Sequence, residues 1–225
     1  MGTNDKDLAS ADRKTRCLII SGIDGSGKTT IINVLKDPLE TEGYSTAYIW
    51  LRFNHYFCKL FHAIARPLGL SVMVNTEMGV VRQHRFYKSS LFCNVYIWAA
   101  YLDTWISRLK YNRVAKHRDF VICDRWITDI IVDLATKTHR EQFIQSRWVK
   151  RFMGILPPHS HLFVVYRHTE DIIGCRLENR VDPDFRLRKD IYDQLLKSPS
   201  ISAIDNCGTI EQSIRQIKKV LEDEK

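Results

Sequence analysis

The sequence predicts one α/β domain in which a doubly wound, five-stranded parallel sheet is flanked by helices. Short apolar runs of strand length alternate with helical segments, and a glycine-rich turn joins the first run to a helix. With 44% hydrophobic and 27% charged residues, the chain has a globular composition, which excludes a disordered or fibrous protein. We expect the domain to span residues 16–225, behind a flexible, polar N-terminal tail at residues 1–15.

The expected strands are apolar runs of four to six residues bounded by turn or polar residues. They are Cys17–Ile20, Thr46–Leu51, Phe120–Cys123, Leu162–Tyr166 and Ser200–Ile204. Their alternation with helices predicts parallel pairing, and the carboxyl ends of such strands meet at one edge of a sheet.

Helices are expected in three places between and after these strands. The first runs from about Gly27 to Lys36, where Pro38 ends it. A helical insertion, aromatic and basic, is expected over about Phe53–Arg118. Its second half, Phe86–Lys116, is expected to form one long helix. The last helix is Ile210–Glu222.

A phosphate-binding motif follows the first strand and opens the first helix. Residues 22–29 have the pattern GxxxxGK[ST], the P-loop motif, in which backbone N–H groups and a helix N-terminus hold phosphate oxygens. Lys28 would reach the β- and γ-phosphates of ATP in a catalytic role, and Thr29 would ligate Mg²⁺. The residues expected to bind ATP here are Gly22, Asp24, Gly25, Ser26, Gly27, Lys28, Thr29 and Thr30.

The charge and the cysteines restrict the class of partner. The net charge of +8 favours an anionic partner, for which phosphate chemistry suffices, and nucleic acid is a less favoured alternative. Six scattered cysteines form no CxxC pair, so we expect reduced thiols and a cytoplasmic location. No run reaches 18 apolar residues, so no membrane span is expected.

Two motifs together resemble the thymidylate kinase family. They are DGSGKTT at residues 24–30 and DRW at residues 124–126, where the family usually has tyrosine in place of Trp126. The resemblance implies ATP and Mg²⁺ as cofactors. It also implies that Asp124 helps Thr29 to hold the metal and that Arg125 binds the acceptor phosphate and acts in catalysis.

The resemblance also implies a lid at about residues 176–190. A helix that begins near Thr169 carries Arg176 and Arg180, which are four residues apart and share one face. In the family such arginines cover the transferring phosphate, so these two are expected to be catalytic. Arg186, from the second part of the lid, is expected to contact ATP.

The acceptor pocket departs from the family pattern. The family has Arg-Glu/Asp-Pro-Gly after the second strand, whereas only Arg52 is present in residues 50–55. The family's nucleotide-binding arginine on the long helix is absent from residues 98–103. The residues expected to contact the acceptor are Asp24, Arg52, Phe53, Arg85 and Arg125.

The sequence therefore predicts a nucleoside-monophosphate kinase that resembles thymidylate kinase, with dTMP as the leading acceptor and a homodimer as an open alternative to a monomer. Related hydroxyl kinases have a glutamate where this chain has Arg52, and an arginine suits an anionic acceptor. One alternative is a kinase for a hydroxyl acceptor, with Asp24 or Asp103 as base. The other is a nucleotide-dependent nucleic-acid-binding protein.

Overall fold

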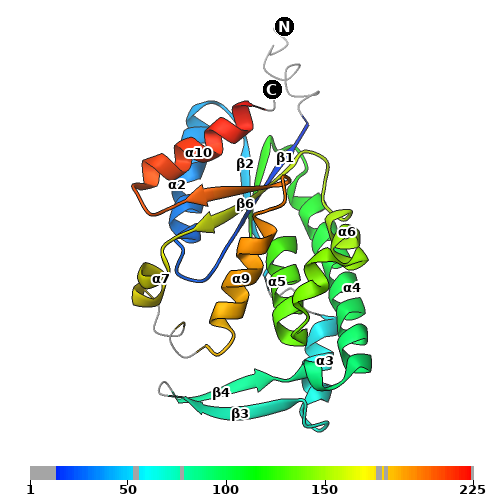
Figure 1. Ribbon diagram of the computed structural model, residues 1–225. Helices are drawn as coiled ribbons and strands as arrows, with labels where there is room; N and C mark the ends of the chain where they lie inside the picture. The colour runs from blue at the N-terminus through cyan, green and yellow to red at the C-terminus, as the bar shows by residue number, and fades with distance from the viewer. Residues whose placement is uncertain (1–13, 53–55, 77–78, 176–178, 180–181, 224–225) are drawn as a thin grey trace, which may run out of the picture.

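The computed structural model describes residues 14–52, 56–76, 79–175, 179 and 182–223, and its centre is a five-stranded parallel sheet (Figure 1). The spatial order of the strands is β2-β5-β1-β6-β7. Their bounds lie within two residues of the predicted ones, so the predicted sheet is confirmed. The strands are β1 (Arg16–Ser21), β2 (Thr46–Trp50), β5 (Phe120–Asp124), β6 (Ser160–Tyr166) and β7 (Ile201–Asp205).

Strand β1 lies at the centre of the sheet, with a strand on each side and helices on both faces. Its residues 17–21 are therefore fully buried. It pairs with β5 on one side, with Cys17 opposite Val121, and with β6 on the other, with Cys17 opposite Ser160. The next strands therefore extend in opposite directions from β1. In such sheets the ligand-binding crevice lies beyond the carboxyl end of the central strand, where the connections diverge.

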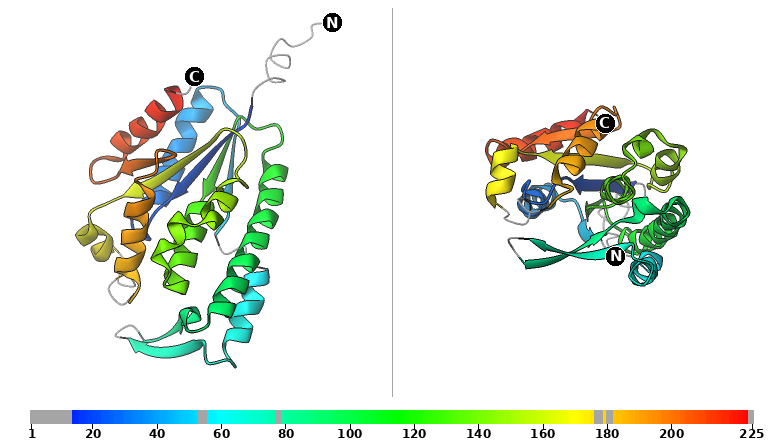
Figure 2. Two further views of the ribbon diagram at one scale, coloured as in Figure 1. Left: turned by 45° about the vertical axis from the view of Figure 1, so that its right-hand side comes forward. Right: turned by 60° about the horizontal axis from the view of Figure 1, so that its bottom comes forward.

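Helices cover both faces of the sheet (Figure 2). The helices α2 (Lys28–Thr41) and α10 (Ile210–Glu222) pack on the face that presents Leu18 and Ile20. The other face is covered by α4 (Ser90–Val114), α5 (Ile127–Thr138) and α9 (Phe185–Leu195). The remaining helices are α3 (Phe57–Ala65), η1 (Phe86–Lys88), η2 (Glu141–Gln145), α6 (Arg147–Met153) and α7 (Thr169–Cys175). In the described ranges, no helix is long and apolar enough to span a bilayer.

Helix α2 continues through Pro38, so the predicted end of this helix was wrong. Pro38 lies in the last turn, where it removes a single backbone donor. Burial favours continuation, because Leu39 lies on the same apolar face as Ile31 and Leu35, and all three are buried. The chain turns away at Gly43, whose φ is 86°.

The insertion between β2 and β5 is only partly helical, and this prediction was also wrong in part. The strands β3 (Ser71–Thr76) and β4 (Gly79–His84) form an antiparallel hairpin. Valines are frequent in both strands, which favours extended backbone over helix. The long predicted helix is confirmed as α4, but it begins at Ser90 because the Ser89 hydroxyl accepts the Phe92 N–H and caps it.

The carboxylate of Asp103 fixes α3 to α4. It accepts three backbone N–H groups at the start of α3, from Tyr56 and Phe57 on Oδ1 and from Cys58 on Oδ2, at 2.9–3.0 Å. Asp103 is 3% exposed. Among the described residues, α3 has no cap from its own N-cap side chain. Asp103 therefore supplies the acceptors that the N-terminus of a helix lacks.

We predict that Asp103→Asn lowers the free energy of unfolding by about 2 kcal/mol, because charge-assisted hydrogen bonds at a helix N-terminus are weakened. Urea unfolding followed by circular dichroism measures the loss. Asp37→Asn, at an exposed position on α2, is the matched control and should change stability by less than about 0.5 kcal/mol. Equal stability of the two variants would contradict the capping role.

Candidate active site

The loop between β1 and α2 has a backbone that glycine alone accommodates well. Gly22, Gly25 and Gly27 have φ values of 137°, 95° and 94°. A Cβ atom on Gly22 would lie 2.6 Å from the carbonyl oxygen of Val165. A Cβ atom on Gly27 would overlap the side-chain nitrogen of Asn206. The loop is thus held close to β6 and to the loop after β7.

Side-chain donors hold the carbonyl oxygens of this loop. Asn206 Nδ2 donates to Ser26 O and Asn179 Nδ2 donates to Asp24 O, both at 2.8 Å. Lys28 Nζ donates to Ile23 O at 2.6 Å. The helix α2 begins at Lys28 and directs the positive end of its dipole at the loop. A strand, a glycine-rich loop and a helix N-terminus in this order fit the phosphates of a nucleotide.

The ammonium group of Lys28 is buried and lies close to charged groups of both signs. Burial, together with the charge of Arg125, lowers the pKa of Lys28 to about 7. An anion beside the group favours its charged form. Lys28 is therefore suited to a phosphate partner.

Two arginines and two aspartates form an arginine–aspartate network beside the loop, made of Asp24, Arg52, Arg125 and Asp129. Arg125 forms an ion pair with Asp24 through Nη2 and with Asp129 Oδ1 through Nη1, the latter at 2.5 Å. Arg52 Nη1 lies 2.9 Å from Asp24 Oδ2. Burial opposes the ionisation of Asp24, but Arg125 and Arg52 outweigh it and lower its pKa to about 2.

The network joins the carboxyl ends of three neighbouring strands. Asp24 follows β1, Arg52 follows β2 and Arg125 follows β5, so sheet topology brings them together. Arg125 has a φ of 62°, a left-handed conformation that is costly for a residue with a side chain. Its N–H donates to Ile20 O at 3.0 Å, which holds this turn against β1. Such strained residues cluster at functional sites.

Thr29 and Asp124, the expected Mg²⁺ ligands, lie on the same side of the sheet. Asp124 has the same parity on β5 as Phe120 and Ile122, which pack with α2. It therefore faces the side of the sheet on which α2 lies, with Thr29 in the first turn of that helix. It accepts the Tyr48 hydroxyl at 3.0 Å. In the described part of the chain, no group of three His, Cys, Asp or Glu could hold a metal. A magnesium ion bound by few protein oxygens takes its other ligands from phosphate and water.

Other predicted residues lie outside the described ranges or at exposed positions of helices. Phe53, Arg176 and Arg180 lie outside the described residues. Arg186 is exposed in the first turn of α9, so the second part of the predicted lid lies on this helix. Thr30 is exposed in the first turn of α2, next to Thr29.

Arg85 is not part of the network. It precedes η1 and its Nε lies 3.4 Å from Gln83 Oε1, and in the part of the chain that the structure describes it makes no ion pair with the network. Its expected contact with the acceptor stays a prediction.

Four residues that position the site were not predicted from the sequence: Asn179, Asp129, Tyr192 and Asn206. Asp129 carried a signal, since it lies four residues after Arg125 at the start of a helix. Asn206 follows β7 directly, at the same edge of the sheet. The other two residues reach the site through contacts that no local pattern indicates.

The structure is similar to two solved thymidylate kinases. The enzyme from Candida albicans aligns with a TM-score of 0.57 and 19% identity over 94% of this chain and 92% of its own. The enzyme from Ehrlichia chaffeensis aligns with a TM-score of 0.52 and 17% identity over 92% of this chain and 98% of its own. The chain has the thymidylate kinase fold. No protein-family model and no curated protein sequence matches the chain.

In this thymidylate kinase fold, the phosphate loop predicts a sharp difference between two glycines. Gly22→Ala should weaken ATP binding at least about tenfold, because its Cβ meets backbone and its φ is strained. Gly43→Ala is the matched control, since Gly43 also has a positive φ but no atom lies within 4 Å of its Cβ position among the described residues. Titration with a fluorescent ATP analogue measures both. Equal affinities would contradict the assignment of the loop.

Proposed function

We propose that this protein is an ATP-dependent kinase that transfers the γ-phosphoryl group to a nucleoside monophosphate, with dTMP as the leading acceptor. The observation that carries the proposal is the convergence of Arg52 and Arg125 on Asp24, directly beside the phosphate loop. Two guanidinium groups from separate strands suit an anionic acceptor, which they can bind bidentately. The thymidylate kinase fold supports the same reaction class.

The carboxylates favour a phosphate acceptor over a hydroxyl acceptor. A hydroxyl group needs a base, and Asp24 and Asp103 were the candidates. Asp24, with a pKa of about 2, is a weak base. Asp103 is buried and is engaged by three backbone N–H groups of α3. A monophosphate needs no base, because its own oxygen is the nucleophile.

The other residues of the site would bind ATP, Mg²⁺ and the acceptor phosphate. Lys28 and the loop N–H groups would neutralise and orient the phosphates of ATP. Thr29 and Asp124 would hold Mg²⁺, which offsets charge on the β- and γ-phosphates. Arg125 would bind the acceptor phosphate. The lid arginines and the two further acceptor contacts complete the proposal: Arg176, Arg180, Arg186, Phe53 and Arg85.

The acceptor range belongs to the proposal as well. The Candida albicans enzyme has a broad substrate specificity, so several monophosphates are suitable test acceptors here. A cytoplasmic location fits the six cysteines, which are all free thiols in the structure.

The decisive experiment is a transfer assay with labelled ATP and a panel of nucleosides and nucleoside monophosphates. We expect transfer to a monophosphate, and Lys28→Ala should lower kcat by about 10²- to 10⁴-fold.

Arg52→Met should weaken use of the monophosphate by about 10- to 100-fold, because a charge-assisted contact is lost. Transfer to nucleosides alone would favour the hydroxyl kinase. Retention on DNA or RNA without any transfer would favour the nucleic-acid-binding alternative.

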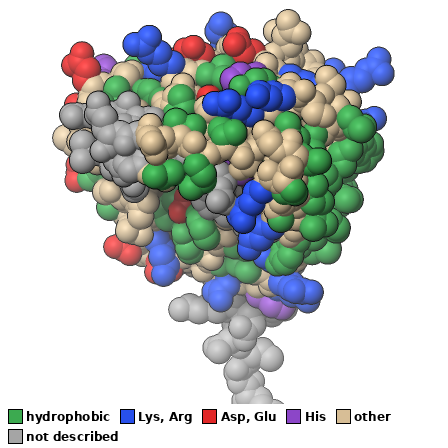
Figure 3. All heavy atoms as spheres, turned by 90° about the horizontal axis from the view of Figure 1, so that it is seen from below, with side chains coloured by type: hydrophobic (Ala, Val, Ile, Leu, Met, Phe, Trp, Pro, Cys, Tyr) green, Lys and Arg blue, Asp and Glu red, His purple; other side chains and the backbone are tan. Residues whose placement is uncertain are grey.

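We also propose that the protein forms a homodimer through α4. Apolar side chains on this helix, each at least 39% exposed, repeat at alternating spacings of four and three residues: Leu91, Val95, Trp98, Leu102, Trp105 and Leu109. This α4 stripe spans about 27 Å at 1.5 Å per residue. Figure 3 shows hydrophobic side chains gathered on this side of the molecule. The opposite face of α4 packs in the core, and a helix that is apolar on all sides is normally buried.

A second copy of α4 fits the stripe in an antiparallel arrangement. The four-three spacing is that of a seam between two helices. Residues 90–102 carry no charge, whereas Arg108, Lys110 and Arg113 lie at the other end of the helix. Antiparallel packing places each basic end beside the neutral half of the partner and keeps like charges apart.

Sedimentation velocity tests the dimer. The wild-type protein should sediment as a dimer at micromolar concentration, and Trp105→Glu should sediment as a monomer, because a charge would be buried in the seam. Met73→Glu, at an exposed position of the hairpin, should remain a dimer. A monomeric wild-type protein, or a dimer that survives Trp105→Glu, would refute the interface.

A further inference from the structure

The guanidinium group of Arg125 is held at one end. Nη1 donates both of its hydrogens, to Gly22 O at 3.2 Å and to Asp129 Oδ1 at 2.5 Å. Nη2 forms the ion pair with Asp24. In the described part of the chain, Nε and the second hydrogen of Nη2 make no hydrogen bond. The edge between Nε and Nη2 is the one that can take a further acceptor.

Asp129 is held in turn by Tyr192. The carboxylate is 6% exposed, and its Oδ1 accepts the Tyr192 hydroxyl at 2.9 Å in addition to Arg125 Nη1. Burial, and next the charge of Asp129, raise the pKa of Tyr192, so its hydroxyl stays protonated and donates. Within the described residues, Oδ2 of Asp129 has no hydrogen-bond partner. The Tyr192 hydroxyl is therefore a main constraint on how this carboxylate is oriented.

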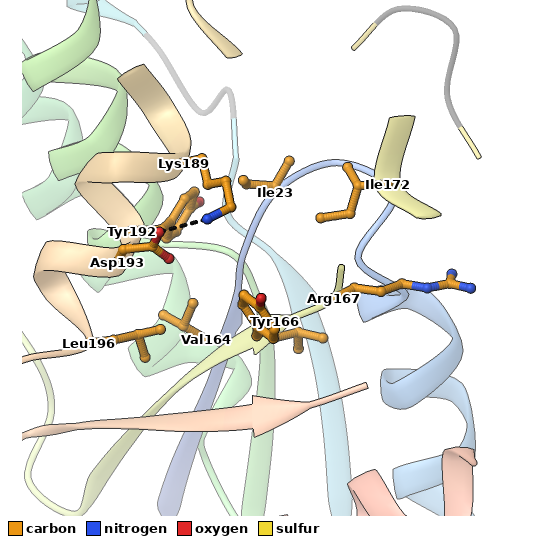
Figure 4. A pocket seen from close by; sticks show the side chains of 10 residues that line it. Ile23, Val164, Tyr166, Arg167, Ile172, Lys189, Tyr192, Asp193 and Leu196 are labelled. Atoms are coloured by element: carbon orange, nitrogen blue, oxygen red, sulfur yellow. Dashed lines mark hydrogen bonds and ion pairs between the residues drawn. The ribbon is translucent and has the colours of Figure 1, made fainter. Parts of the chain in front are cut away.

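Tyr192 connects the network to α9. Figure 4 shows Tyr192 projecting from α9 beside a pocket that Ile23 of the phosphate loop also lines. The helix begins at Phe185, and the pair between Arg188 Nη1 and Asp182 Oδ2, at 2.7 Å, fixes its start to the preceding turn. The Tyr192 hydroxyl thus links α9 directly to Asp129.

We infer that Tyr192 and Asp129 are positioning residues for Arg125. They keep Nη1 in the core and leave the Nε and Nη2 edge free for two oxygens of an acceptor phosphate. A fork of this kind binds phosphate bidentately only when the plane of the guanidinium group is fixed. The inference rests on the proposed function for its ligand, and on the contacts of Arg125 for its geometry.

Tyr192→Phe tests the inference, because it removes one hydroxyl and keeps the ring. The KM for dTMP, or for the best monophosphate of the panel, should rise at least about tenfold, because a hydrogen bond to a charged carboxylate is lost, while the KM for ATP changes less than about twofold. Tyr101→Phe is the matched control, since Tyr101 packs against Trp148 and Phe152, away from the network. A loss of packing alone would raise both KM values or neither.

A second measurement needs no acceptor. In ¹⁵N spectra of the arginine side chains, the Arg125 Nη1 group of the wild-type protein should rotate slowly, because two acceptors hold it, and Tyr192→Phe should speed this rotation. If no monophosphate is phosphorylated, the proposed function fails, but the nitrogen signals still decide whether Tyr192 holds Arg125. Unchanged signals in Tyr192→Phe, or an equal change in Tyr101→Phe, would overturn the inference.

Discussion

Burial of the Arg125 guanidinium group is the constraint on which the site depends. A charged group of this size is costly to remove from water, and the cost is offset only when acceptors surround it in good geometry. Arg125 obtains them from the phosphate loop and from the start of α5. The ends of β1 and β5 and the first turn of α5 therefore cannot shift independently. The left-handed backbone at Arg125 persists because these contacts over-determine it.

The same constraint organises the charges around the loop. Two cations, Arg52 and Arg125, share the carboxylate of Asp24. This one negative charge offsets only part of their positive charge, and both guanidinium groups lie at the same edge of the sheet. A ligand phosphate would share these two cations with Asp24 rather than enter a bare positive pocket. In the proposed reaction Lys28, whose ammonium group donates to Ile23 O of the loop, would serve the nucleotide. One loop thus separates two phosphate-binding functions in the proposed reaction.

The sequence predicted the sheet and the phosphate loop because both are encoded locally. Each strand is a short apolar run, and the loop is a contiguous motif. The hairpin and the course of α2 through Pro38 were missed, since packing of residues such as Leu39 overrode local propensity. Arg52 and Asp24 were predicted separately, whereas their pairing was not. Tyr192 and Asn179 reach the site across 63 and 155 residues, distances that no pattern in one sequence reveals.

The capping of α3 by Asp103 has a consequence for synthesis of the chain. A nine-residue helix is marginal by itself, and this one depends on acceptors that follow it in sequence. Cys58 precedes Asp103 by 45 residues, which at 5–20 residues per second corresponds to roughly 2 to 9 s of translation. During that interval the first N–H groups of the segment that becomes α3 lack the Asp103 carboxylate and are hydrogen-bonded to water. Its apolar side chains are then available to chaperones until α4 leaves the ribosome.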